Sequence, residues 1–189
     1  EAIAQIHQQG QTCFAENYVQ EGVDKVNALS DLNIEWHFIG PIQSNKTRPV
    51  AEHFDWVQTL DREKIAQRWN EQRPEHLAPL NVLIQVNISA QDSKSGIALN
   101  AVSNLATFIA SQPKLVLRGL MCIPAPLDDA QLKEEFIAMH QAFTQLKSEY
   151  QTVDTLSMGM SGDCALASAI NTQYEWRNEH DKDCIYRWR

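Results

Sequence analysis

The segment from Leu156 to Asp163 holds the residues best suited to contact a phosphate group. Its small residues let the backbone approach a ligand at the end of a strand, and Ser161 adds a hydroxyl donor. The alternative is a strand that ends in an ordinary turn at Ser161 and Gly162, and the pattern alone favours that interpretation. Phosphate binding at Ser161 is therefore a hypothesis that needs support from the rest of the chain.

Two further polar side chains, Asn17 and His37, lie in or just after short apolar runs. Asn17 either caps the next helix or points its amide at the end of the sheet, and the pattern alone favours the cap. A lone histidine in an apolar strand is more often a hydrogen-bonded core residue than a catalyst. Strand alternation places His37 and Ile39 on one face, so the direction of that face decides the role of His37.

Two cations close to predicted strands, Lys94 and Arg118, are considered as anion contacts. Lys94 lies in a polar loop with small neighbours and is a candidate contact for an anion, although a solvated loop lysine is the more common outcome. Arg118 lies at the opposite end of its strand, and we expect it to be structural. The chain has no Ser-His-Asp arrangement, P-loop or Gly-x-Gly-x-x-Gly fingerprint, which disfavours hydrolase and nucleotide-binding functions.

The four cysteines are widely spaced, with no Cys-x-x-Cys pair and no histidine at zinc-finger spacing. This spacing predicts neither a metal site nor a disulfide framework. Cys13 and Cys122 lie in apolar runs, so we expect them to be buried and inert thiols.

Six short apolar runs carry these residues and alternate with amphipathic stretches, a pattern typical of β-α-β-α organisation. The predicted strands are residues 12–15, 36–39, 54–60, 82–88, 115–123 and 156–160. The predicted helices are residues 1–9, 17–29, 46–53, 62–72, 99–111 and 129–150. Asp61 is expected to cap the fourth of these helices, and Asp128 places negative charge at the start of the last.

Strand-helix units in series fit either an open doubly wound sheet or an α/β barrel. In a barrel the carboxyl ends of the strands meet at one mouth, where binding sites are built. Asn17, His37, Asn87 and Ser161 all lie at or just after such strand ends. A barrel would collect these side chains in one site, which favours the barrel.

The composition excludes several classes of function. A formal net charge of -8 disfavours nucleic-acid binding, which depends on clustered Lys and Arg. No apolar run approaches the ~20 residues of a membrane helix, and the first residues do not resemble a signal peptide. A chain of 189 residues suits one domain with a sizeable core. We therefore expect a cytoplasmic, single-domain protein that contacts no membrane.

Five stretches of the chain are highly specific when taken together. They are residues 14–21 (FAENYVQE), 36–46 (WHFIGPIQSNK), 86–88 with 93–96 (VNI and SKSG), 118–121 (RGLM) and 156–161 (LSMGMS). In these stretches the chain closely resembles the pyridoxal phosphate (PLP) homeostasis protein family, whose fold is similar to the barrel domain of alanine racemase.

The resemblance implies a TIM-type (β/α)8 barrel that binds PLP as a Schiff base, acts as a monomer and has no established turnover. Members of the family are thought to buffer the cofactor and to deliver it to PLP-dependent apo-enzymes. By position, Asn17 and His37 would line the cofactor ring, Met158 would pack near it, and Ser161 would contact its phosphate. The resemblance implies no catalytic residue.

The chain departs from the family pattern at both ends. The family's PLP-binding lysine lies in a Val-Ser-Lys-Thr-like motif on the first strand, whereas this chain starts with a predicted helix. Residues 164–189 do not match the Gly-Ser-Thr loop and Val-Arg-Ile-Gly strand that follow in the family. We therefore expect residues 1–163 to form a PLP-binding barrel domain without its first and last strands, followed by a divergent tail over 164–189. Open sheet edges and impaired cofactor binding would follow.

Two alternatives remain, a PLP-dependent amino-acid racemase on the same barrel and an inactive fragment. Racemisation needs a lysine base and an opposing acid, and racemases of this type add a second domain that 189 residues cannot hold. The favoured prediction is a cofactor-binding protein that is not an enzyme.

Overall fold

The computed structural model describes residues 2–160 and 162–173, which form one six-stranded parallel sheet with helices. The strands are β1 (Cys13–Glu16), β2 (Glu35–Phe38), β3 (Trp56–Leu60), β4 (Leu80–Val86), β5 (Leu115–Cys122) and β6 (Thr155–Ser157). The α-helices are α1 (Ala2–Gln8), α2 (Val19–Ala28), α3 (Thr47–His53), α4 (Glu63–Gln72), α5 (Val102–Ala110), α6 (Asp129–Glu149) and α7 (Cys164–Gln173). Two 3-10 turns, η1 (Ser44–Lys46) and η2 (Leu99–Ala101), precede α3 and α5. The predicted strands and helices are confirmed, with small shifts at their ends.

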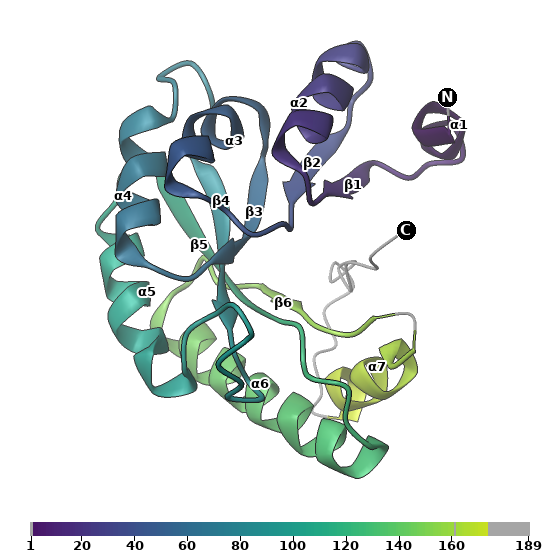
Figure 1. Cartoon of the computed structure of the whole chain (residues 1–189), viewed down its shortest axis with the longest axis vertical. Coiled ribbons are helices and arrows are strands. Elements are labelled where there is room, and N and C mark those ends of the chain that lie inside the picture. The colour runs from purple at the N-terminus through teal and green to yellow at the C-terminus, as the bar shows by residue number, and fades with distance from the viewer. Residues whose placement is uncertain (1, 161, 174–189) are drawn as a thin grey trace.

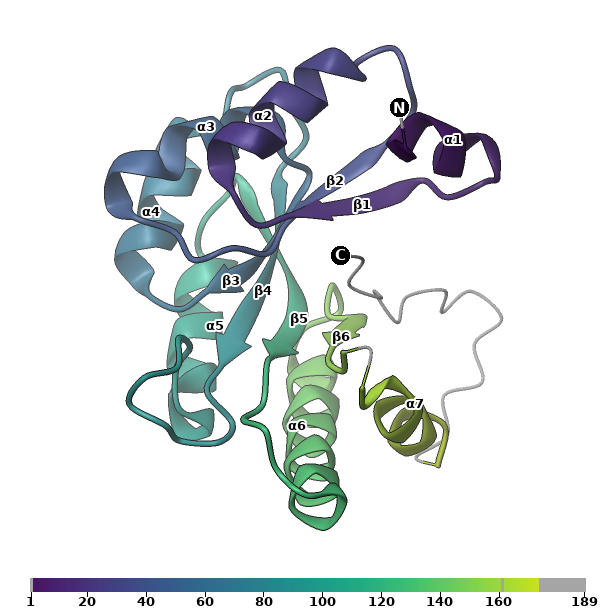
Figure 2. The same ribbon diagram turned by 45° about the vertical axis from the view of Figure 1, so that its right-hand side comes forward.

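The strands follow one another across the sheet in chain order, and each neighbouring pair is parallel. A doubly wound sheet reverses its strand order at a switch point, whereas a barrel does not. Helices α2 to α6 lie along the convex side of the curved sheet (Figures 1 and 2). Among the described residues, β1 pairs with β2 alone and β6 with β5 alone, so the sheet is an open half-barrel.

The main apolar core lies between the sheet and the helices on its convex side. Alternate strand residues such as Phe38 and Ile84 enter this core, where they meet helix residues such as Trp69 and Phe136. In α4, burial of Ile65 and Trp69 follows the i, i+4 spacing of one helix face. The helices therefore fix the curvature of the sheet by covering one of its faces.

The two predictions about helix starts have different outcomes. Asp128 does cap α6, because its carboxylate accepts a hydrogen bond from the backbone N–H of Gln131 at 3.0 Å. The prediction for Asp61 is wrong: α4 begins after Arg62, and no side chain bonds its first N–H groups. The Asp61 carboxylate instead accepts a hydrogen bond from the Arg62 guanidinium at 2.6 Å.

Helix α7 was not expected, and it packs against the same core as the rest of the chain. Ala167 and Ile170 on this helix are buried, and α7 lies beside α6 (Figure 1). The predicted domain boundary after Asp163 remains a prediction. No helix in the described ranges is both long enough and apolar enough to cross a membrane.

Candidate functional site

The concave face of the sheet carries the polar residues of the strands. Because side chains alternate along a strand, Phe38 points into the convex core while His37, its neighbour, points to the concave side. On β3 the same alternation separates Val57, in the convex core, from Gln58. The concave face is thus the interior of the half-barrel. His37 and Ile39, which the sequence placed on one face of their strand, both project to it.

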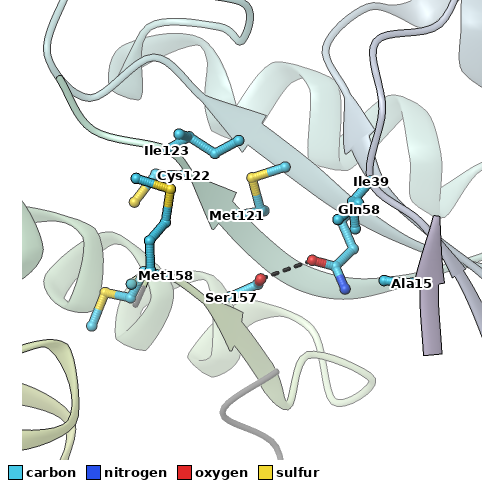
Figure 3. Close-up of a pocket in the computed structure, with 10 residues that line it drawn as sticks. Ala15, Ile39, Gln58, Met121, Cys122, Ile123, Ser157 and Met158 are labelled. Atoms are coloured by element: carbon cyan, nitrogen blue, oxygen red, sulfur yellow. Dashed lines mark hydrogen bonds between the residues drawn. The ribbon is translucent and has the colours of Figure 1, made fainter. Parts of the chain in front are cut away.

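A pocket opens at the carboxyl ends of the strands, and we call it the mouth pocket (Figure 3). It spans about 450 Å³ of space, part of which is open solvent. Its walls are mostly apolar or sulfur-containing, and the described part of the chain contributes two polar side chains, Gln58 and Ser157. The lining residues are Ala15, Ile39, Gln58, Met121, Cys122, Ile123, Ser157, Met158, Gly159 and Met160.

Four side chains form a continuous inner polar network, defined by Glu35, His37, Gln58 and Ser157. His37 Nε2 lies 3.0 Å from the Glu35 carboxylate, and His37 Nδ1 lies 3.1 Å from Gln58 Nε2. The Ser157 hydroxyl donates to Gln58 Oε1 at 2.8 Å, the bond drawn in Figure 3. Because a carboxylate only accepts, Nε2 carries the imidazole proton and Nδ1 accepts from Gln58. The network therefore runs from the base of β2 to the mouth pocket.

The Glu35 carboxylate is held as an anion by its neighbours. The hydrogen bond from His37 lowers the pKa of Glu35 to about 2, against partial burial, which raises it. The indole N–H of Trp56 lowers this pKa further, and the Cys13 thiol does so with a hydrogen bond of 3.4 Å. The Trp56 and His37 rings also stack, with centroids 5.1 Å apart. His37 is thereby fixed on its edge and on its face.

Asn17 lies at the carboxyl end of β1, as predicted, but its side chain is exposed and does not line the mouth pocket. The preferred prediction that Asn17 caps α2 is wrong, because Tyr18 occupies the cap position and makes no side-chain cap bond. The backbone of Asn17 instead packs against Gly40 at the end of β2. A Cβ at Gly40 would lie 2.0 Å from the Asn17 carbonyl oxygen, so this contact requires glycine.

The structure places the predicted residues at different distances from the mouth pocket. Met158 lines it, and His37 reaches it through Gln58. Ser161 falls outside the described residues, and its predicted phosphate contact remains a prediction. Gly159 turns the chain between β6 and α7 with φ +92°, a conformation that favours glycine. Helix α7 therefore begins beside the pocket wall.

The two cations considered in the sequence, Lys94 and Arg118, form hydrogen bonds with other groups of the protein. Lys94 donates to the Pro124 carbonyl at 3.0 Å, next to the pocket residue Ile123. Arg118 is structural, as expected: it donates to Asp154 at 2.9 Å and to Asn81 at 3.0 Å, and its guanidinium lies over the Trp56 ring. These cations are therefore engaged by the protein itself.

Of the two cysteines expected to be inert, one fits that expectation closely. Burial, with smaller contributions from the charges of Glu135 and Asp163, raises the pKa of the Cys122 thiol to about 12. Cys13 is only partly buried, because the outer edge of β1 is uncovered in the described chain.

Gln58 and Ser157 were not singled out in the sequence, although they supply the polar groups of the mouth pocket. Their signal was present as a polar side chain inside an apolar strand, at residues 54–60 and 156–160. Such residues are expensive to bury without partners, and their partners lie on strands far apart in the chain.

Comparison with known proteins identifies the family. The model of the alanine racemase N-terminal domain matches residues 1–177. The pyridoxal phosphate homeostasis protein of Pasteurella multocida is 60% identical over 175 residues, which cover 90% of this chain and 74% of the relative. The protein of that name from Escherichia coli is 54% identical over 177 residues, covering 90% and 75%.

Solved structures agree with this assignment. PipY of Synechococcus elongatus is 31% identical and has been solved without PLP, with a TM-score of 0.82, and with PLP bound, with a TM-score of 0.76. Both matches cover 89% of this chain and 80% of PipY. The α/β barrel of the alanine racemase type is therefore confirmed as the fold class. By sequence and by fold, the chain belongs to the pyridoxal phosphate homeostasis protein family.

Proposed function

We propose that this chain binds PLP in the mouth pocket and takes part in homeostasis of the cofactor without converting a substrate. The observation that carries the proposal is the position of Gln58 and Ser157, two hydrogen-bonding groups in an otherwise apolar pocket at the strand ends. Barrels of this type build their sites at that end. The proposal is supported by the PLP-bound structure of PipY, a relative at 31% identity.

The lining residues fit the ring of PLP better than its charged groups. Ile39, Met121 and Met158 offer apolar and polarisable contacts to an aromatic ring, and Gln58 with Ser157 can bond its polar substituents. The phosphate would meet the start of α7, where backbone N–H groups favour an anion. When bound, PLP supplies a reactive aldehyde, which the pocket would hold away from other amines.

Binding by this chain is proposed to be weak and non-covalent. Among the described residues, none that lines the mouth pocket is a lysine, so this part of the chain offers no amine to the aldehyde. The charge of Asp163, which precedes α7, contributes to the raised pKa of Cys122 on the pocket wall. A phosphate at this end of the pocket would therefore meet negative charge. Asn17 and His37 are not among the lining residues, so their roles in this proposal are indirect. They position the pocket and do not touch the ring.

Delivery of PLP to apo-enzymes and a monomeric state complete the proposal. Tyr18 and Met160 are large, exposed side chains, with 64% and 38% of their surfaces accessible, and Met160 also lines the pocket. The exposed Met160 side chain offers an apolar contact to an acceptor at the pocket, and weak binding suits release.

Equilibrium dialysis of the PLP-free protein against PLP tests the proposal. We expect Ser157→Ala to weaken binding about fivefold to tenfold, since it removes one hydrogen bond worth about 1 kcal/mol. Ser103→Ala on the convex side, an exposed serine of α5, is the matched control and should not change binding. Reactivation of an added apo-enzyme in the same chamber should follow the PLP released.

Three outcomes would overturn parts of the proposal. No retention of PLP by the wild-type protein contradicts cofactor binding. Equal binding by Ser157→Ala and Ser103→Ala contradicts the mouth pocket as its location. Racemisation of alanine by the PLP-loaded protein, absent from the PLP-free sample, contradicts a role without turnover.

A further inference from the structure

A second cluster of chemically reactive side chains lies away from the mouth pocket, at the base of the concave face. It consists of Cys13 on β1 with Glu35 and His37 on β2. The thiol sulfur, one carboxylate oxygen and one imidazole nitrogen all lie within 4.8 Å of one another. Within the ranges that the structure describes, this is the one group of at least three such ligands that meets that distance.

The backbone holds these three ligands in place. Cys13 and Glu35 are direct partners in the parallel ladder of β1 and β2. His37 follows two residues after Glu35, so both side chains project from the same face of β2. The ladder fixes the spacing of all three residues, and little side-chain ordering would be needed to bind an ion.

The distances suit tetrahedral coordination by a zinc-type cation. Zinc binds sulfur at ~2.3 Å and nitrogen or oxygen at ~2.0 Å, so neighbouring ligand atoms in a tetrahedron lie roughly 3.3–3.6 Å apart. Here the sulfur lies 3.4 Å from Glu35 Oε1, and His37 Nε2 lies 3.0 Å from the same oxygen. Only small side-chain rotations are therefore needed to admit the ion.

The indole N–H of Trp56 is an independent indication of a cation site at this cluster. Its nitrogen is fully buried beside the Glu35 carboxylate, and within the described residues it has no well-formed hydrogen bond. Carboxylates that bind a metal through one oxygen commonly accept a hydrogen bond on the other. Trp56 is placed to make that bond once the carboxylate turns toward an ion.

Gln58 gives His37 the support that metal-bound histidines need. An ion at Nε2 requires the ring proton on Nδ1, where it must meet an acceptor. If the Gln58 amide turns over, its Oε1 accepts from Nδ1 and its NH2 group donates to Ser157. The links from His37 to Gln58 and from Gln58 to Ser157 are kept in both states, so the inner polar network stays connected when an ion is bound.

We propose that Cys13, Glu35 and His37 bind a divalent cation of the zinc type, with water in the fourth position. The Cys13 thiol loses its proton to solvent on binding, and the imidazole proton moves from Nε2 to Nδ1. The ion can enter from outside, because the Glu35 side chain is 44% exposed and Cys13 is only partly buried. The site lies apart from the mouth pocket, and the Gln58 amide connects the two.

Titration of the PLP-free protein with Co²⁺ tests the site directly. A thiolate ligand gives a sulfur-to-cobalt charge-transfer band, and four-coordination intensifies the visible bands, so the spectrum reports both. We expect one equivalent to bind and Zn²⁺ to displace it. Cys13→Ser should abolish the charge-transfer band and weaken Zn²⁺ binding on the order of 100-fold.

Cys164→Ser is the matched control, because Cys164 is also partly buried and outside any disulfide. It should leave the spectrum and the affinity unchanged. Glu35→Gln tests a second ligand without removing the thiol and should weaken binding while keeping the charge-transfer band. A wild-type protein without that band, or equal effects of Cys13→Ser and Cys164→Ser, would overturn the proposal.

Discussion

The two faces of the same sheet differ in what they bury. On the convex face, residues such as Phe38 and Val57 pack against helices in an apolar core. On the concave face, strand positions one residue away carry His37 and Gln58, which are equally buried but hydrogen-bonded to each other. One face gains its stability from apolar area, whereas the other depends on every polar group having a partner.

Within a single strand, the side chains on the convex face can therefore stabilise the fold while those on the concave face serve binding. Burial of a large apolar side chain stabilises by several kcal/mol, whereas a net hydrogen bond contributes about 1 kcal/mol. The convex face can therefore hold the half-barrel together while the concave face varies its side chains. In β2 both roles meet in adjacent residues, which makes that strand the best place to test the comparison.

Phe38→Ala should have the largest effect. Phe38 is fully buried in the convex core, where its ring meets Phe54 edge to face with centroids 5.4 Å apart. Loss of this ring leaves a cavity and should reduce the free energy of unfolding by about 3–5 kcal/mol. Urea unfolding followed by circular dichroism measures the change.

The matched variant is Trp36→Phe, which keeps a ring on the same face of the same strand. It should cost clearly less, because most of the apolar volume stays in place. Equal costs for the two variants would show that the convex core does not depend on local packing at β2.

Gln58→Leu should have an intermediate effect and act on the other face. Its amide is buried and joins His37 to Ser157. Leucine keeps the approximate volume but leaves the imidazole Nδ1 and the serine hydroxyl without partners, which should cost about 1–3 kcal/mol. Denaturant unfolding measures this cost.

A double-mutant cycle with Ser157→Ala sharpens the result for Gln58. If the inner polar network is a unit, the double variant should cost less than the sum of the two single variants, because the second change removes a group that already lacks a partner. Strict additivity of the two costs would contradict the network.

Much of the fold could be predicted from the sequence, because apolar runs and helix periodicity reflect local burial. The run at residues 82–88 predicted the strand that became β4, which is buried along almost its whole length between β3 and β5. Asp128 was recognised as the start of α6 because a carboxylate at that position acts within four residues. Signals of this kind depend only on near neighbours in the chain.

The site was less accessible from the sequence, because its contacts join distant strands. The hydrogen bond between Gln58 and Ser157 joins residues 99 positions apart, and the sequence around either residue does not indicate the other. The same holds for Cys13 and Glu35, which are 22 positions apart and which the β1–β2 ladder places side by side. The cap predicted for Asn17 was wrong because α2 begins one residue later, with Tyr18 at the cap position.

The smallest effect is expected for chemical labelling of Cys122. This residue lies where the two faces of the sheet meet, because it lines the mouth pocket and also contacts the convex core. With the pKa of its thiol raised to about 12, roughly one molecule in 10⁴ carries the thiolate at pH 8. Iodoacetamide should therefore label Cys122 much more slowly than the partly buried Cys164, as measured by peptide mass spectrometry. The fold should be unaffected.

The dependence on pH and salt shows which cause raises the pKa of Cys122. The labelling rate should rise about tenfold per pH unit between pH 8 and pH 10, because the thiolate fraction does so below the pKa. Added salt screens the charges of Glu135 and Asp163 but leaves burial unchanged. Since burial is the larger cause, salt should change the rate little. A strong acceleration by salt would show that the charges of Glu135 and Asp163 are the larger cause, and labelling as fast as at Cys164 would show that burial does not protect the Cys122 thiol.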